Sequence, residues 1–353
     1  DFGDLVAPGP FARLAYMATG LGHQAVVVFF VLSGFFIGYS VLSAQKRGRF
    51  SPRDYVIRRT SRIYVVLVPA LIVTLLLDSL GIFLFGTSNT VYGGEVDAPF
   101  LELPVVGDNL GLGVFLGNLL QLQPILGTAE YGSNGPLWSL PYEAWAYLIF
   151  PLALAGRTSS KATTKLASIT LLAMLFLLGG ALLVLYFSIW GMGAALSHWW
   201  LSNSPRAAPP LGRHVAVITT IIASAAATII GRGRLLHSQS LEDLLLGVAT
   251  TSVLWALLRR PSAWKTPRYA AAGASLAGFS YSLYLFHYPA VAFVHAATLG
   301  SNRWTPTPTT SLWGISITIG IAMFWCYPLS RLTESQTERV RALLTNIMPG
   351  RRT

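Results

Sequence analysis

Residues 46–62 read KRGRFSPRDYVIRRTSR, a dense basic run between two long apolar segments, 25–43 and 63–85. An apolar helix of about 20 residues is long enough to cross the hydrocarbon core of a bilayer. Lys and Arg collect in the cytoplasmic loops of membrane proteins, so a basic run between two such segments indicates an inner-face loop. This stretch therefore predicts an integral membrane protein.

The composition agrees with that prediction. Hydrophobic residues make up 53% of the chain and charged residues 11%, with a mean hydropathy of +0.55, whereas soluble globular domains are about 25% charged. The net charge of +11 does not indicate a nucleic-acid partner, because the basic residues lie between apolar segments and form no exposed stripe. The single cysteine, Cys326, lies in an apolar run, and no HExxH, CxxC or carboxylate cluster occurs at ligand spacing. We therefore expect neither a disulfide framework nor a metal.

Nine apolar segments have a length suited to crossing a bilayer as helices. They are 25–43, 63–85, 137–156, 166–182, 184–199, 214–231, 243–258, 276–298 and 311–330. Because a single residue separates 166–182 from 184–199, this pair is either one broken helix or a tight hairpin. Residues 111–123 are apolar but too short to span, which indicates an interfacial or re-entrant segment. The predicted fold class is all-α, a polytopic integral membrane protein with about nine transmembrane helices.

The charges predict the orientation. If the loop at 44–62 is inside, the alternate loops and the tail at 331–353 are inside too, and together they carry 21 of the 25 Lys and Arg. The long loop at 86–136 has neither Lys nor Arg and lies outside. This positive-inside pattern predicts a multi-pass protein of the inner or plasma membrane with a cytoplasmic C-terminus. It also places residue 1 outside, so we expect a preceding helix, about ten in all, and a single membrane domain over 1–353.

Ionisable groups at membrane depth are costly and mark candidate sites. If the helix of the second segment extends back to Arg59 and Arg62, their spacing of three places them on one face. With Arg58 they suit a phosphate or pyrophosphate, which guanidinium groups bind bidentately. The alternative is that these arginines only set the topology and contact the anionic headgroups of membrane lipids.

Glu143 follows a helix-start signal at the mouth of its segment. Ser139 is a candidate helix cap and Pro141 fits the first turn. Glu143 then lies near the helix N-terminus, whose dipole favours a carboxylate. Either Glu143 orients a catalytic base or binds a sugar hydroxyl, or it only stabilises the start of the helix.

His287 lies near the middle of 276–298, on one helical stripe with Ser280 and Tyr284. A histidine there is a candidate general base, because its ordinary pKa is close to neutrality. The alternative is a structural histidine that donates to a backbone carbonyl. Pro289 favours the alternative, because a proline interrupts a helix and frees a carbonyl.

The first segment contains Gly34 and Gly38, whose spacing of four lets another helix approach closely. His23 precedes this segment at the outer edge. It is either catalytic or simply hydrated, and the sequence shows no orienting partner for it. Asp78, inside the second segment, is likewise without visible context.

Four stretches match a known pattern in order: FFVLSGFFIG at 29–38, RRTSRIY at 58–64, GPLWSLPYE at 135–143 and FSYSLYLFHYP at 279–289. Over nearly the whole chain they resemble the acyltransferase 3 family of membrane O-acyltransferases. The resemblance implies an acyl-CoA donor, with acetyl-CoA the first choice, bound at the inner face. It also implies an acceptor hydroxyl, often of a sugar, presented at the outer face.

The resemblance also assigns roles to individual residues. Arg59 and Arg62 match the family's arginine pair and would hold the CoA phosphates. Glu143 matches the acid of the WSLxxE motif, and His287 the histidine of SYSLYLxHxP. Pro141 replaces a small or polar residue of the family pattern. The family's main catalytic histidine lies in a first helix upstream of the segment where this chain begins, so we expect the chain as written to lack that base.

The predicted function is transfer of an acyl group from acyl-CoA to a hydroxyl of a cell-envelope or extracellular carbohydrate. One alternative acceptor is a small hydrophobic molecule such as a macrolide. A membrane transporter is the alternative from another class, although no two related halves with paired broken helices are apparent. The full set of candidates is catalytic Glu143, His287 and His23; donor-binding Arg58, Arg59 and Arg62; and motif residues Ser33, Gly34, Trp138, Ser139 and Tyr284.

Overall fold

A computed structural model describes residues 21–86, 90–93, 105–203, 238–258, 270–299 and 308–347. Every regular element in these ranges is a helix, which confirms the all-α prediction for the described chain. Four of these helices are long and apolar enough to cross a membrane: Gly22–Lys46, Pro52–Phe85, Ala162–Ser202 and Gln239–Leu258. Several such helices in one chain are typical of a multi-pass membrane protein.

The other predicted spans have different outcomes. The segments predicted at 137–156, 276–298 and 311–330 are largely helical in the structure but are not among these four. The segment predicted at 214–231 lies outside the described residues. The apolar stretch at 111–123 contains the short helix α5, Leu112–Leu119, and ends where the four-residue α6, Gln123–Leu126, begins, in agreement with its being too short to span.

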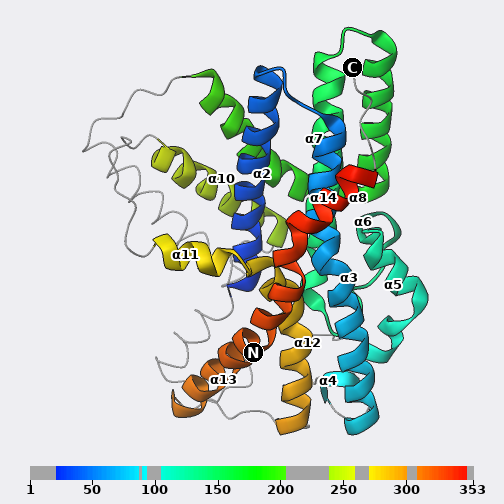
Figure 1. The fold of residues 1–353 in the computed structure, drawn as a ribbon, viewed down its shortest axis with the longest axis vertical. Helices are drawn as coiled ribbons and strands as arrows, with labels where there is room; N and C mark the ends of the chain where they lie inside the picture. Colours follow the sequence, from blue (N-terminus) through cyan, green and yellow to red (C-terminus); the bar gives the residue numbers. More distant parts are fainter. Residues whose placement is uncertain are drawn as a thin grey trace. The chain divides into compact units, whose positions relative to one another are not determined.

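The described elements are helices joined by loops (Figure 1). By their contacts they belong to two compact units. Unit 2 contains α2 (Gly22–Lys46), most of α7 (Leu140–Thr158), α8 (Ala162–Ser202) and α10 (Gln239–Leu258). Unit 1 contains α3 (Pro52–Phe85), α4 (Thr90–Gly93), η2 (Val106–Leu110), α5, α6 (Gln123–Leu126), η3 (Gly135–Trp138), the first turn of α7, α11 (Ala270–Ala277), α12 (Ser280–Leu299), α13 (Pro308–Leu332), η4 (Glu334–Gln336) and α14 (Thr337–Ile347).

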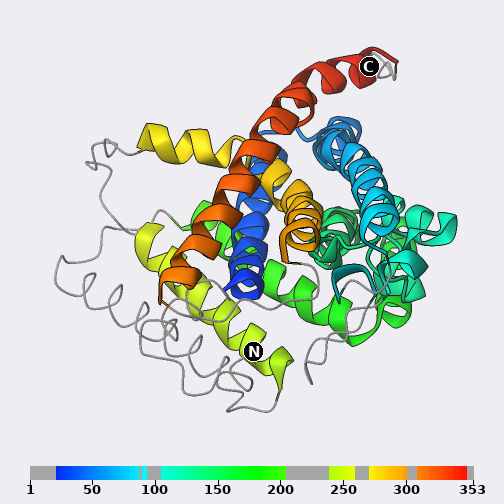
Figure 2. The same ribbon diagram turned by 90° about the horizontal axis from the view of Figure 1, so that it is seen from below.

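In unit 1, α12 packs between α3 and α13, and α14 packs against α3. Figure 2 shows α13 leading through the short η4 into α14. The helix α3 begins at Pro52, a position where the missing N–H of proline costs nothing. The start at Pro52 is eleven residues earlier than the apolar segment predicted from residue 63, and it brings the basic run 52–62 into the helix.

Two predicted spans are interrupted. The long helix α8 contains one residue with non-helical torsions, Gly180, at φ 64° and ψ −168°. This backbone conformation is open to glycine because it has no Cβ, and it confirms the broken-helix alternative for 166–199. The segment predicted at 276–298 is divided at Gly278 and Phe279 into α11 and α12. The prediction that Pro289 interrupts its helix was wrong, because α12 continues through this residue to Leu299.

In unit 2, α2 and α8 pack closely through small residues. A Cβ atom on Gly34 would collide with the main-chain carbonyl of Trp190, and one on Gly38 would lie 3.0 Å from the Cα of Ala194. The indole Nε1–H of Trp190 donates to Ser33 Oγ at 3.2 Å. The predicted close approach at Gly34 and Gly38 is therefore confirmed, and the partner helix is α8.

Candidate active site

The arginines of the basic run lie in the first three turns of α3. Because this helix begins at Pro52, Arg59 and Arg62 do share a helical segment, as predicted. The guanidinium of Arg59 lies over the ring of Tyr55, 5.5 Å from its centroid, in a cation–π arrangement. Arg58 and Arg62 are exposed. The end of α3 thus carries four guanidinium groups, of which Arg53 is bound to the Thr345 carbonyl and the other three are suited to phosphate.

Tyr281 of α12 lies where several motifs of unit 1 meet. Its hydroxyl donates to the backbone oxygen of Ile63 at 3.2 Å. Glu143, Arg62 and Glu334 all interact electrostatically with Tyr281. One helix from each of three distant parts of the sequence therefore contributes a charge to the same neighbourhood.

Glu143 is 6% exposed and lies in the first turn of α7, which begins at Leu140. Pro141 is in that first turn, as predicted. The side chain of Ser139 takes a different role from the predicted cap, because its hydroxyl lies 2.7 Å from the hydroxyl of Tyr284. The Tyr284 O–H donates to the Pro136 carbonyl at 2.9 Å, so Ser139 donates to Tyr284. This chain of hydrogen bonds fixes the segment before Glu143 against α12.

Trp138 ends η3, and its ring lies 6.4 Å from that of Tyr142 in an edge-to-face arrangement. Such a pair stabilises the start of α7 beyond its buried area. The motif residue Trp138 therefore has a packing contact within its own motif.

Asp78 is fully buried in α3 and has partners that the sequence did not reveal. Its carboxylate accepts from the backbone N–H of Ser133 at 2.7 Å and from the Ser133 hydroxyl at 2.8 Å. These charge-assisted bonds offset the cost of burying the carboxylate. Burial, and then the nearby Asp78 charge, raises the pKa of both Tyr92 and Tyr131, so these two phenols of the connecting loop remain uncharged.

Asn134, next in the chain, fastens the same loop to two helices. Its Nδ2 donates to Thr74 Oγ1 at 3.1 Å and to the backbone oxygen of Leu285 at 2.9 Å. Leu285 lies four residues before Pro289, whose missing N–H leaves that carbonyl without its helical donor. The prediction that Pro289 frees a carbonyl is therefore confirmed, and Asn134 is the group that satisfies it.

His287 donates from Nδ1 to the backbone oxygens of Leu283, at 2.8 Å, and Tyr284, at 3.0 Å. Both acceptors require a proton on Nδ1, so the lone pair of the neutral ring is on Nε2. The predicted structural contact is present, and it also selects the tautomer that a base at Nε2 requires.

His23 contacts a carboxylate that the sequence did not reveal as its neighbour. In unit 2, its Nε2 lies 2.8 Å from Oδ1 of Asp243 in α10. The Tyr186 hydroxyl of α8 donates to Oδ2 of the same carboxylate at 3.2 Å. The sequence could not show the contact of His23 with Asp243, because the two residues are 220 positions apart.

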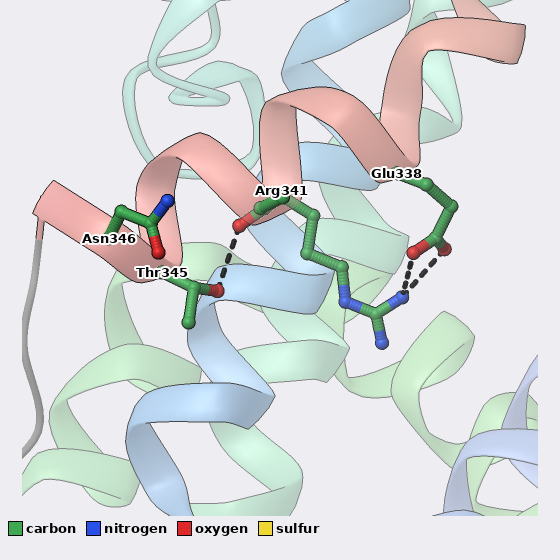
Figure 3. Close-up of a pocket in the computed structure, with 5 residues that line it drawn as sticks. Glu338, Arg341, Thr345 and Asn346 are labelled. Carbon is green, nitrogen blue, oxygen red and sulfur yellow. Dashed lines mark hydrogen bonds and ion pairs between the residues drawn. The ribbon is translucent and has the colours of Figure 1, made fainter.

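A shallow pocket of about 320 Å³ lies on α14, lined by Glu338, Arg341, Ala342, Thr345 and Asn346 (Figure 3). Arg341 pairs with Glu338 at 2.6 Å, which neutralises the charge at the pocket. Arg53 of α3 donates to the Thr345 carbonyl at 2.6 Å and ties α14 to α3. This pocket gathers no candidate catalytic residue.

Sequence reasoning missed four polar residues of these networks: Tyr281, Glu334, Asn134 and Asp243. Asp243 opens an apolar segment, so the rule that ionisable groups near membrane depth need partners was a usable signal. Tyr281 is within a recognised motif, but its central position depends on packing. Glu334 and Asn134 lie just outside apolar segments and had no local signal.

Comparison with known proteins identifies the family. A model described as an acyltransferase domain matches residues 1–331. A protein from Shigella phage Sf6 named O-acetyl transferase is 28% identical over 141 residues, which is 40% of this chain and 37% of that relative. The chain thus covers little more than a third of that relative's length, and no solved structure is significantly similar. The family match favours an enzyme over the transporter alternative. Its extent, nearly the whole sequence, shows that the chain belongs to the acyltransferase 3 family.

Proposed function

We propose that the protein moves an acetyl group from acetyl-CoA to a hydroxyl of a cell-envelope or extracellular carbohydrate. The observation that carries the proposal is that Arg62, Glu143 and Glu334 each interact electrostatically with Tyr281. A cationic end of one helix and a buried carboxylate then lie in one unit, as a reaction between an anionic donor and a hydroxyl requires. The relative named O-acetyl transferase supports acetyl as the transferred group.

Arg58, Arg59 and Arg62 are assigned to the phosphates of the donor. The exposed guanidiniums of Arg58 and Arg62 present forked donors that match phosphate oxygens. Tyr55 stacks on Arg59 and restricts its side chain, which reduces the entropy lost on binding. The positive-inside pattern supports a cytoplasmic position for this end of α3, where acyl-CoA is available.

Glu143 and His287 are assigned to the substrates held in unit 1. Glu143 is buried and preceded by the Ser139–Tyr284 hydrogen bond, so its position is well defined for accepting a hydrogen bond from a sugar hydroxyl. The Nε2 lone pair of His287 supplies a second acceptor.

The reaction balances without a metal or a redox step. The acceptor oxygen loses its proton to the base and attacks the thioester carbonyl carbon, forming a C–O bond. The tetrahedral intermediate then expels the CoA thiolate as the C–S bond breaks, and the proton passes to the sulfur. The products are the O-acetyl ester and free CoA.

The donor assignment is tested by measuring acetyl-CoA affinity of the purified protein in nanodiscs. Arg59→Lys and Arg62→Lys should each raise the Kd about tenfold, because a planar guanidinium that binds phosphate bidentately is replaced by a compact ammonium group. Arg49→Lys, an exposed position of the same basic run, is the matched control and should bind normally. Unchanged affinity in both variants would remove the assignment.

The acceptor is tested with radiolabelled acetyl-CoA and two acceptor classes, a panel of p-nitrophenyl glycosides and a macrolide. Label should enter the glycosides, and Glu143→Gln should abolish its incorporation while acetyl-CoA still binds. Label entering only the macrolide would replace the carbohydrate by the alternative acceptor. Wild-type incorporation in Glu143→Gln would leave Glu143 with its helix-start role alone.

A further inference from the structure

We propose that Glu334 is a positioning residue for donor binding: it holds the start of α12 and, through it, the part of α3 that carries the donor-binding arginines. The inference rests on the proposed function, because it takes those arginines to bind the phosphates of acetyl-CoA. Glu334 lies in η4, beyond residue 331, where the family match ends. The family match therefore gives this carboxylate no role.

The carboxylate of Glu334 holds the first turn of α12. Ser282 is the third residue of this helix, so its N–H has no acceptor within the helix. Glu334 Oε2 accepts from this N–H at 2.9 Å, and a carboxylate at a helix N-terminus also interacts favourably with the helix dipole. The neighbouring Thr333 adds a contact, because its Oγ1 lies 3.4 Å from Oγ of the buried Ser282. The short helix η4 is thereby tied to the start of α12.

Tyr281, next to Ser282, connects this turn to α3. Its hydroxyl donates to the backbone oxygen of Ile63 at 3.2 Å. Ile63 directly follows Arg62 in α3, and both Arg62 and Glu334 interact electrostatically with Tyr281. A displacement of the first turn of α12 therefore moves the tyrosine that is bonded to the residue beside Arg62.

The other end of the arginine-bearing part of α3 is held by the same C-terminal segment. Arg53 Nη2 donates to the Thr345 carbonyl of α14 at 2.6 Å. The helix α14 directly follows η4, and both pack against α3 within unit 1. The stretch from Arg53 to Ile63 includes all three donor-binding arginines. It is therefore fixed at both ends by contacts that depend on residues 333–345.

This arrangement predicts an effect on affinity and not on the chemical step. An arginine on a well-fixed stretch of helix loses less freedom when it binds phosphate, and ordering one long side chain corresponds to about a two- to tenfold change in Kd. The donor phosphates do not react, so their contacts stabilise the bound substrate and the transition state alike. Weakening such contacts raises KM and leaves kcat unchanged.

The test measures the Kd for acetyl-CoA of the purified protein in nanodiscs, with KM and kcat for release of CoA thiol in the presence of the glycoside panel. Glu334→Ala should raise Kd and KM about two- to tenfold and leave kcat at the wild-type value. Glu334→Gln keeps an oxygen that accepts from the Ser282 N–H, so it should give a smaller rise. Glu338→Ala removes an exposed carboxylate of α14 and, as the matched control, should bind normally.

A double-variant cycle tests whether Glu334 acts through Tyr281. Tyr281→Phe removes the hydroxyl that bonds the Ile63 carbonyl, and it should itself raise the Kd. In that background, Glu334→Ala should raise the Kd by a smaller factor than in the wild type, because the link to α3 is already broken. Equal factors in the two backgrounds would overturn the inference.

These measurements separate the inference from the proposed function. A wild-type protein that binds no acetyl-CoA would refute the donor assignment and this inference with it. A normal Kd in Glu334→Ala, alongside weaker binding by Arg62→Lys, would refute the inference alone. So would a lower kcat with an unchanged KM.

Protection of the buried Cys326 from a thiol-specific dye shows that each variant is folded. If Glu334→Ala does not fold, Glu334→Asp replaces it, because it keeps the charge while its shorter side chain no longer reaches the Ser282 N–H. A normal Kd in Glu334→Asp would refute the inference equally.

Discussion

The bond between Asn134 and the Leu285 carbonyl allows a quantitative test of how this fold tolerates a proline in α12. Asn134→Leu keeps the approximate volume of the side chain but removes the donor at 2.9 Å from that oxygen. Thr74 still donates to the Ala70 carbonyl at 2.8 Å, so its hydroxyl proton remains satisfied. The main effect of the substitution is therefore that the carbonyl of the fully buried Leu285 loses its hydrogen-bond donor.

A buried carbonyl without a donor costs about 1–3 kcal/mol. Pro289→Ala returns an N–H that can bond the Leu285 carbonyl within the helix. In the Pro289→Ala variant the Leu285 carbonyl has a second donor. Asn134→Leu should therefore lower the free energy of unfolding by about 1 kcal/mol less, or by a still smaller amount, than it does in the wild type. Pro328→Ala is the matched control, because it returns an N–H to α13 and leaves Leu285 unaffected.

The assay uses the single cysteine of the chain, Cys326, which is fully buried and reacts with a thiol-specific dye only on unfolding. Thermal midpoints of the wild type, the three single variants and the two double variants give the coupling energy. Asn134→Leu should lower the thermal midpoint by about 2–4 °C for each kcal/mol of stability lost, or by less because the chain is long. An equal fall in the Pro289→Ala and wild-type backgrounds would refute the reasoning.

Three further predictions concern other contacts. Gly34→Ala should destabilise the protein by about 1–3 kcal/mol in the dye assay, because the added methyl meets a backbone carbonyl of α8, whereas Gly22→Ala, with open space around it, should not. Asp78→Ala should remove the two charge-assisted hydrogen bonds from Ser133, worth about 1.5–3 kcal/mol each, and should speed hydrogen exchange at the Ser133 amide. Slow exchange at that amide in the variant would show that Asp78 does not hold the loop. Arg53→Gln should speed exchange in α14, whose Thr345 carbonyl it binds at 2.6 Å, and unchanged exchange would show that other contacts hold this helix.

Much of the local structure followed from the sequence. Long apolar segments predicted helices, and the four-residue spacing of Gly34 and Gly38 predicted a close helix contact, which the structure has with α8. Pro289 indicated a freed carbonyl, and the structure shows one at Leu285. These features depend on hydrophobic length, helical periodicity and the chemistry of single residues, all of which are local.

Partners between distant polar groups did not follow from the sequence. Asp78 and His23 each looked isolated, yet their partners Ser133 and Asp243 lie 55 and 220 residues away. The same limit explains why Ser139, a plausible helix cap, instead bonds Tyr284, 145 residues later. A polar side chain takes whichever buried partner the packed helices bring within about 3 Å, and no spacing rule along the chain reports that choice.

By itself, the sequence determined that this protein is helical, apolar and similar to membrane O-acyltransferases, because segment length, composition and short motifs are written in consecutive residues. Only the tertiary structure decided that Arg62, Glu143 and Glu334 interact with Tyr281, and that Asp243 contacts His23. The physical reason is the cost of burying charge. A buried ionisable group requires a partner, and which partner it finds is settled by how the helices pack.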